Sequence, residues 1–436
     1  MEPGRYAQWL LEQETRALLS RLARVRPFAL QETRVPAASP SYAAQEAIEA
    51  FLVRGRRELR EQARRFLAWI ASPEGHAAPP DRAHRRYVFL RLRFNAVLSQ
   101  FDIFSEAMSQ RSVCETGIWL AGLDAVARDA LDLPGYLVPP PVICYLARGP
   151  GGAIRRARTR LPGGGENPVA MIRLPRERMI GSGLASSLVH EVGHQGAALL
   201  GLVESLRTAI GEAARRPGRE GFAWRTWGRW LPEIVADLWA IARVGIVSTL
   251  GLIGVVSLPR AFVFRANLDD PHPMPWMRVR LSAALGEALY PHPQWGRVLA
   301  VWDSFYPRPG LDAVHAAFLD LLEETLPRLV EVLVRHRPPL LRGRTLAEAM
   351  GTEGRQPARL LATFKGWRAA PVRMRGAPPA LAFAVIGQAR ADGILGPEEE
   401  GKILAGLLRY WALKCALRGS AICARSMEIA GVPGVA

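Results

Sequence analysis

The sequence predicts a mostly helical α+β protein in which a small sheet lies between two helical regions. Apolar residues recur with helical periodicity near both ends of the chain, and short β-prone runs with glycine-rich turns lie between them. Hydrophobic residues make up 49% of the 436 positions. This composition is typical of a globular protein and excludes disorder, collagen and coiled coil as descriptions of the whole chain.

The change of periodicity divides the chain into three regions. We expect a helical N-terminal region over residues 1–135, an α+β core over residues 136–306 and a helical C-terminal region over residues 307–436. In the first region proline-rich segments separate the expected helices, which are Gln8–Arg24, Tyr42–Ala71 and Arg86–Leu131, the last with a break around Gln110–Ser112. The expected strands, joined by glycine-rich turns, are Val142–Leu146, Ile154–Arg160 and Val169–Leu174.

Helical periodicity returns after the strands. The expected helices are Ser182–Val203, Trp230–Leu250, Met277–Leu289, Gln294–Ser304, Leu311–Val334, Pro379–Ala391 and Pro397–Leu417. The segment Arg337–Gly376 is rich in Arg, Pro and Gly, and we expect a linker or a loose helical connection there. Trp224, Trp227 and Trp230 are spaced three apart, and we expect them to pack in the core rather than to form a substrate platform.

One uncharged apolar segment, Val244–Leu258, raises the question of a membrane span. It is shorter than the roughly 20 residues that cross a bilayer, and it contains Gly245, Gly251 and Gly254. We therefore expect a buried core helix, and no membrane span.

The net charge of +17 comes almost entirely from arginine, since only three residues are lysine. The accompanying excess of Ala, Leu, Pro and Gly resembles a coding bias, so a nucleic acid is not the expected partner. The runs Arg54–Arg65, Arg82–Arg93 and Arg148–Arg160 are nevertheless dense enough to attract an anionic surface. Solvated helix faces are the interpretation we favour, and a basic binding patch is the alternative.

The four cysteines are Cys114, Cys144, Cys415 and Cys423, and no two of them form a CxxC pair. Their spacing indicates neither a structural zinc knuckle nor a disulfide framework. We therefore expect a reducing, cytoplasmic compartment.

A possible metal-binding motif lies in the first expected helix after the strands. His190 and His194 are one helical turn apart, so both imidazoles lie on the same face and can bind one metal ion. Glu191 lies next to the first histidine and can act on a water molecule without being a ligand. Two neutral nitrogen ligands, a carboxylate base and an open position are what a hydrolytic zinc site needs.

A third ligand is available on the next strongly helical segment. Glu233 can complete a His, His, Glu set, and Asp237, one turn later, can accept the free N–H of a ligand histidine. Because Pro232 precedes Glu233, the alternative is an acidic first turn at a helix start. We predict one zinc ion per chain, bound by His190, His194 and Glu233.

The two motifs together, His-Glu-x-x-His at residues 190–194 and Glu-x-x-Ala-Asp at residues 233–237, resemble the gluzincin metallopeptidases. The segment His272–Arg278, a His-Pro with Arg five residues after the Pro, is similar to the group that contains the CAAX prenyl endopeptidases and the HtpX-type proteases. Metzincins are disfavoured, because Ala197 and Leu200 stand where that family has Gly and His. The resemblance covers roughly residues 142–306.

The resemblance implies a zincin-like metallopeptidase core with Glu191 as catalytic base. It also implies that His272 and Arg278 lie near the substrate, with His272 in catalysis and Arg278 supporting the site. In such proteins the run Val169–Leu174 would be an edge strand that pairs with an extended peptide. The chain is expected to differ from the membrane-bound members, because the sequence around the motif shows no convincing membrane span.

Two functions follow from these observations. The first is a zinc-dependent endopeptidase acting on a protein or peptide substrate. The alternative is a non-proteolytic structural or cargo protein that keeps the zinc site and binds an anionic partner through its basic faces.

Overall fold

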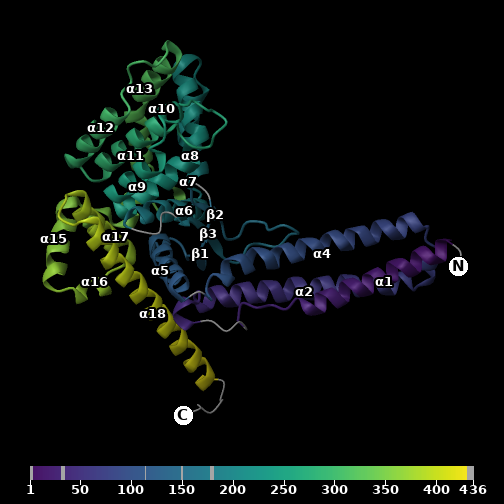
Figure 1. Cartoon of the computed structure of the whole chain (residues 1–436). Helices are drawn as coiled ribbons and strands as arrows, with labels where there is room; N and C mark the ends of the chain where they lie inside the picture. Colours follow the sequence, from purple (N-terminus) through teal and green to yellow (C-terminus); the bar gives the residue numbers. More distant parts are fainter. Residues whose placement is uncertain (1–2, 31–34, 113, 149–150, 177–180, 430–436) are drawn as a thin grey trace.

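The structure is a computed structural model that describes residues 3–30, 35–112, 114–148, 151–176 and 181–429. Figure 1 shows a long helical arm that projects from a larger, mostly helical body. Helices make up 73% of the structure, and three strands form a small mixed sheet, so the mostly helical α+β class is confirmed.

The arm consists of long helices from the N-terminal region. Its elements are α1 (Pro3–Arg24), the 3₁₀ helix η1 (Pro36–Ala38), α2 (Tyr42–Ile70), α3 (Pro73–Ala77) and α4 (Pro80–Ser109). The helices α1, α2 and α4 all contact one another, and their apolar faces enclose a core that includes Leu18, Phe51 and Phe104. Ser41 begins α2 by accepting a hydrogen bond from the backbone amide of Ala44.

The sheet lies between the arm and the body. Its order is β1-β3-β2, with β1 (Val142–Ala147) parallel and β2 (Ala153–Arg155) antiparallel to the central β3 (Ala170–Pro175). Alternate residues face opposite sides: Ile143 and Met171 belong to the core of the arm, whereas their neighbours Cys144 and Ile172 belong to the core of the body. The sheet is therefore apolar on both faces and joins the two cores.

A buried ion pair fixes β1 against α5 (Cys114–Leu131). Asp124 of α5 accepts hydrogen bonds from Arg111 at 3.1 Å and from the backbone amide of Cys144 at 2.7 Å. Arg111 also donates to the carbonyl of Cys144 at 2.6 Å. The end of the arm, the first helix of the body and the first strand are thus held together at one point.

The body is built from the remaining helices. They are α6 (Gly183–Leu199), α7 (Leu202–Arg215), α8 (Gly218–Val244), α9 (Ile246–Val256), α10 (Arg260–Val263), α11 (Pro275–Leu289), α12 (Gln294–Phe305), α13 (Ala313–Arg335), η3 (Pro339–Leu341), α14 (Leu346–Met350), η4 (Thr352–Arg355), α15 (Pro357–Ala369), α16 (Val372–Gly376), α17 (Pro379–Ala391) and α18 (Pro397–Ile429). Their core extends from Leu120 of α5 to Trp411 of α18, so helices from all three predicted regions contribute to it. The boundaries of those regions stay a prediction.

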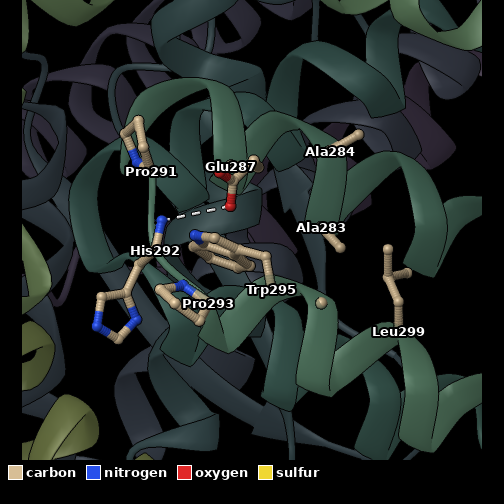
Figure 2. A pocket seen from close by; sticks show the side chains of 9 residues that line it. Ala283, Ala284, Glu287, Pro291, His292, Pro293, Trp295 and Leu299 are labelled. Carbon is tan, nitrogen blue, oxygen red and sulfur yellow. Dashed lines mark hydrogen bonds between the residues drawn. The ribbon is translucent and has the colours of Figure 1, made fainter.

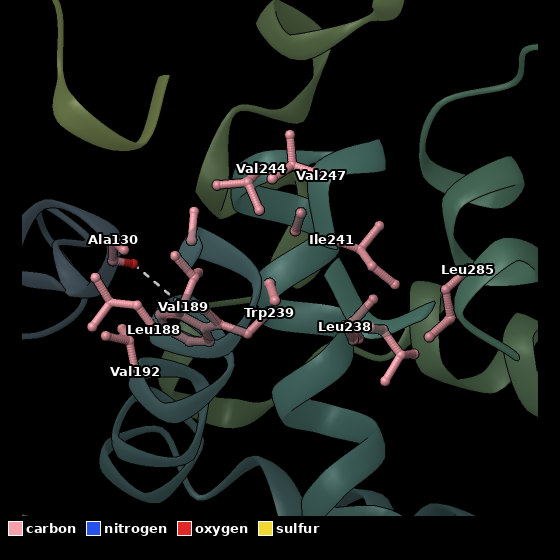
Figure 3. Close-up of a cluster of buried hydrophobic side chains, with 14 of the residues drawn as sticks. Ala130, Leu188, Val189, Val192, Leu238, Trp239, Ile241, Val244, Val247 and Leu285 are labelled. Carbon is pink, nitrogen blue, oxygen red and sulfur yellow. Dashed lines mark hydrogen bonds between the residues drawn. The ribbon is translucent and has the colours of Figure 1, made fainter. Parts of the chain in front are cut away.

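The central contact of the body is between α6 and α8. Gly193 and Gly196 face α8 so closely that a Cβ at Gly193 would lie 2.8 Å from the Cα of Ala236, and one at Gly196 would lie 2.3 Å from the ring of Trp239. Figure 3 shows Trp239 among aliphatic side chains of α6 and α8, with its indole N–H donating to the carbonyl of Ala130 at 3.1 Å. The two glycines therefore allow the helix backbones to approach closely.

The helices differ from the sequence-based expectations at two places and agree with them at a third. The segment Arg337–Gly376 is not a loose linker, because it forms short helices whose Leu341, Leu360 and Phe364 are buried in the body core. The helix expected to begin at Trp230 begins at Gly218, and Pro232 lies inside it. The three expected core tryptophans occupy this earlier part of α8 and are buried, as predicted.

The apolar segment Val244–Leu258 forms the end of α8 and all of α9. Most of its side chains are buried against the rest of the body, so the predicted core helix is confirmed. Within the described part of the chain, none of the helices combines the length and the apolar character that crossing a membrane requires.

Candidate metal centre

The predicted metal ligands come together where α6 crosses α8. His190 and His194 lie on the face of α6 that meets Glu233 of α8, and their rings are nearly perpendicular, with centroids 4.9 Å apart. The Nε2 atom of His190 lies 3.1 Å from Oε2 of Glu233, and Nε2 of His194 lies 3.4 Å from Oε1 of the same carboxylate. Residues more than 40 positions apart in the sequence thus form one cluster.

This cluster fits a zinc ion. Nitrogen and oxygen ligands lie about 2.0 to 2.2 Å from zinc, so in a tetrahedral arrangement they lie about 3.3 to 3.5 Å from each other. Each histidine Nε2 lies at about that separation from a different oxygen of Glu233, and one ligand atom from each of the three residues lies within 4.8 Å of the others. Among the described residues, this is the group of three whose donors could hold a metal ion.

Asp237 orients the first histidine, as the sequence predicts. Nδ1 of His190 lies 2.7 Å from Oδ1 of Asp237, so a neutral His190 that donates its N–H there directs the lone pair of Nε2 toward the cluster. Asp237 also accepts two hydrogen bonds from Arg278, from Nε at 2.7 Å and from Nη2 at 2.9 Å. Arg278 of α11 is therefore buried beside the cluster. It hydrogen-bonds Asp237, which in turn hydrogen-bonds His190.

His272 reaches the cluster from the loop before α11. Its Nε2 atom lies 3.1 Å from Oε2 of Glu233, and its Nδ1 atom lies 2.8 Å from Oδ1 of Asp270. About half of its side chain is exposed, so it lies at the rim of the site, above Glu233. Its ring bridges two carboxylates while remaining accessible to a ligand.

Glu191 lies beside the cluster without joining it. Its side chain is buried, and burial raises the pKa of its carboxyl group. Gly152, next to β2, leaves the room for it, because a Cβ at that position would lie 2.8 Å from Oε1 of Glu191. A carboxylate with a raised pKa next to a metal cluster suits a group that accepts and returns a proton.

The charges of the cluster strongly shift its pKa values. Burial alone would raise the pKa of Glu233. Hydrogen bonds from His190 and His272, together with the charges of His190 and His194, outweigh this effect and hold the pKa far below its usual range. Burial works against a charged His190, yet the Asp237 carboxylate and its hydrogen bond raise the pKa of this histidine to about 9. Burial and the charge of His190 lower the pKa of His194 to about 4.

The cluster forms the floor of an open cleft. The cleft has a volume of about 550 Å³ and is walled by β2, the start of α7, the middle of α8 and the loop before α11. Its lining residues outside the cluster are Gly152, Ala153, Ile154, Arg156, Val203, Glu204, Arg207, Pro232 and His272. Glu191 also lines this cleft, so the predicted base and the predicted ligands open into the same space.

The strand along the cleft differs from the expected one. Val169–Leu174 was expected to be the edge strand that a peptide could pair with, but β3 lies in the middle of the sheet, with β1 and β2 on either side. The edge strand that lines the cleft is β2. A strand was expected at Ile154–Arg160, but β2 ends at Arg155, and a run of three residues is too short to show which strand lies at the edge of the sheet.

Two buried amide side chains that were not predicted from the sequence hold β2 and the residues after it in place. Gln195, which follows His194 on α6, accepts a hydrogen bond from the backbone amide of Ala157 at 2.8 Å. Asn167 donates to the carbonyls of Arg155 and Arg156 at 3.2 and 3.1 Å. Gln195 directly follows His194. A polar residue among apolar neighbours on a helix indicates a buried hydrogen bond, and this could have pointed to Gln195.

Figure 2 shows another hollow, between α11 and α12, with a volume of about 740 Å³. It is lined mainly by apolar residues such as Ala283 and Leu299, and Glu287 in it accepts a hydrogen bond from the backbone amide of His292 at 3.3 Å. None of its lining residues belongs to the metal cluster, so it is separate from the cleft.

Comparison of the chain with protein-family models, with curated proteins and with solved structures gives no match. The residues and geometry of the site therefore carry the functional interpretation.

Proposed function

We propose that the protein is a zinc-dependent endopeptidase of the gluzincin type. The observation that carries this proposal is the convergence of His190, His194 and Glu233, whose ligand atoms lie within 4.8 Å of one another, beside Glu191 in an open cleft. The two histidines are partly buried and Glu233 is buried, and nitrogen and oxygen donors gathered in this way are the ligand types that zinc takes in proteins. The same geometry supports one zinc ion per chain.

The residues of the site have distinct tasks in this proposal. Zinc, when bound, supplies Lewis acidity that polarises the peptide carbonyl and makes a water molecule easier to deprotonate. Glu191 takes a proton from the attacking water and passes it to the leaving amine. His272 stabilises the negative charge that develops on the carbonyl oxygen, and Asp237, held by Arg278, keeps His190 in the tautomer that ligates through Nε2.

The peptide would lie along β2. This strand pairs with β3 on one side, and its other side borders the cleft. An extended peptide could add to this edge through backbone hydrogen bonds, which would bring its carbonyl over the cluster. Because Gln195 connects the end of β2 to α6, the strand and the metal ligands keep a fixed separation.

A reducing, cytoplasmic setting belongs to the same proposal. Among the residues whose side chains are described, Cys144 and Cys415 are free thiols, which is common in proteins kept in a reducing compartment.

The alternative is a non-proteolytic zinc protein that binds an anionic partner through its basic faces. One observation favours it: the hairpin after β2 packs on the arm and places Arg160 close to Arg93 of α4. A Cβ built on Gly164 would lie 3.5 Å from Nη1 of Arg93 and 4.0 Å from Nη2 of Arg160. Two of the predicted arginine runs are thus neighbours in space, and such a surface attracts anions.

A protein digestion assay separates the two functions. The purified protein is incubated with casein, with and without a chelator, and zinc is then added back to the chelated sample. The peptidase proposal predicts cleavage that the chelator abolishes and zinc restores. A sample that carries zinc but cleaves neither casein nor a mixed peptide library would contradict the peptidase proposal and favour the alternative.

A further inference from the structure

The cleft above the metal cluster has an uneven charge. Two arginines line its walls, Arg156 after β2 and Arg207 on α7. Arg207 forms an ion pair with Glu204 on the preceding turn, at 2.6 Å, so a neighbouring carboxylate already balances its charge. Within the described part of the chain, Arg156 has no such ion pair, and its side chain is exposed.

The position of Arg156 is fixed by its backbone. Its carbonyl accepts hydrogen bonds from Asn167 at 3.1 Å and from Thr159 at 2.6 Å, and the following amide, of Ala157, donates to Gln195 at 2.8 Å. Asn167 and Gln195 are each only 1% exposed, so their two contacts are largely shielded from water, whereas the Thr159 contact is exposed. The backbone of Arg156, which directly follows β2, is thereby held at a fixed distance from α6, the helix that carries His190 and His194.

We propose that the cleft selects peptides with an acidic side chain close to the scissile bond, and that Arg156 is the residue that selects them. This inference rests on the proposed peptidase function. A guanidinium group binds a carboxylate through two parallel N–H···O bonds, so Asp and Glu suit this position. A lysine or arginine in the same place would bring like charges together and is disfavoured.

The size of the preference follows from the exposure of Arg156. Exposed ion pairs contribute little because water and salt screen them, whereas the walls of a cleft reduce that screening. We expect acidic peptides to be preferred over their amide counterparts roughly threefold and over lysine peptides roughly tenfold. Raising the ionic strength reduces both ratios.

The experiment uses the full chain and peptides that differ at one flanking position, with Glu, Gln or Lys. Two quantities are measured: kcat/KM with the wild-type protein, and peptide binding by fluorescence anisotropy with Glu191→Gln, which should bind peptide without cleaving it. Arg156→Glu is compared with Arg160→Glu. The second variant makes the same charge change four residues further along the hairpin, at an exposed position that does not line the cleft.

The expected result is a preference for Glu peptides that Arg156→Glu reverses toward Lys peptides and that Arg160→Glu leaves unchanged. Cleavage without any charge preference, or equal effects of the two variants, would overturn the inference while the peptidase proposal stands. Binding of Glu peptides that depends on Arg156, but without cleavage by the wild type, would support the inference and contradict the peptidase proposal. Failure of any peptide to bind would contradict both.

Discussion

At the scale of single residues, the site depends on one carboxylate with two tasks. Asp237 forms a 2.7 Å hydrogen bond with His190 and also pairs with the buried Arg278. Arg278 has its guanidinium in the interior, where a charged group without a partner is costly. Asp237 is therefore expected to contribute both to metal affinity and to stability.

The two carboxylates on α8 should respond differently to removal. Glu233→Ala deletes a proposed ligand, whereas Asp237→Ala deletes an orienting contact, which typically costs about 10-fold to 100-fold in metal affinity. We expect Asp237→Ala to weaken zinc binding less than Glu233→Ala. It should also lower the free energy of unfolding by about 1 to 3 kcal/mol, because Arg278 loses two hydrogen bonds to Asp237 and keeps the 3.6 Å ion pair with Glu233. Competition with a zinc-binding dye and chemical denaturation measure the two effects.

Asp303→Ala provides the matched control for this pair. It removes the carboxylate that accepts a 2.8 Å hydrogen bond from Arg280, also on α11, at a partly exposed position away from the cluster. This variant should keep the zinc affinity of the wild type and lose little stability. A greater loss of zinc affinity from Asp237→Ala than from Glu233→Ala would mean that the two roles are exchanged.

The sequence predicted which residues meet at the site but not what surrounds them. The spacing of His190, His194, Glu233 and Asp237 follows from helix geometry, which is why these residues could be named and are found together. Arg156 has no such local signal, because its place in the cleft depends on a hairpin that folds back onto α6. Contacts of this kind arise from tertiary packing and leave no periodic pattern in the chain.

At the scale of elements, the close approach of α6 and α8 positions the ligands. Both helices are long and strongly periodic, and the sequence predicted them, although α8 begins earlier than expected because Pro232 is tolerated inside it. A proline in a helix removes one hydrogen bond and is usually a boundary, which is why the sequence favoured a start there. Packing of Trp224 and Trp227 in the body core supports the earlier turns.

Gly193→Ala tests this close approach. The added Cβ would lie 2.8 Å from the Cα and 2.9 Å from the carbonyl oxygen of Ala236, and backbone atoms cannot move aside easily. We expect a loss of about 1 to 3 kcal/mol in the free energy of unfolding. Zinc affinity should also fall, since His190 and His194 would shift relative to Glu233.

Gly211→Ala is the control for the same substitution. Gly211 lies on α7, and a Cβ there would meet only Nη1 of Arg215, at 3.7 Å. Because alanine favours a helix by about 1 kcal/mol over glycine, this variant should be as stable as the wild type or more stable. Thermal unfolding and zinc titration compare the two variants, and full stability and zinc affinity of Gly193→Ala would rule out the packing argument.

At the scale of the whole molecule, the sheet separates a helical arm from the body that holds the site (Figure 1). Both ends of the chain are helical, as predicted, but they pack differently. The N-terminal helices build the core of the arm, and the C-terminal helices contribute to the core of the body. Glu400 of α18 even accepts a hydrogen bond at 3.2 Å from the backbone amide of Ser182, just before α6. The sequence could not predict this arrangement, because amphipathic helices can pack in many combinations.

The central claim is that His190, His194 and Glu233 bind zinc for Glu191 to use in peptide hydrolysis. The most direct test measures zinc content and peptide turnover together in the wild type and in Glu191→Gln. Glutamine keeps the shape of the side chain but cannot accept a proton. Both proteins should therefore hold one zinc ion per chain by elemental analysis, while kcat falls about 100-fold to 10,000-fold in the variant. Equal cleavage by the variant and the wild type, or the absence of bound zinc from both, would contradict the claim.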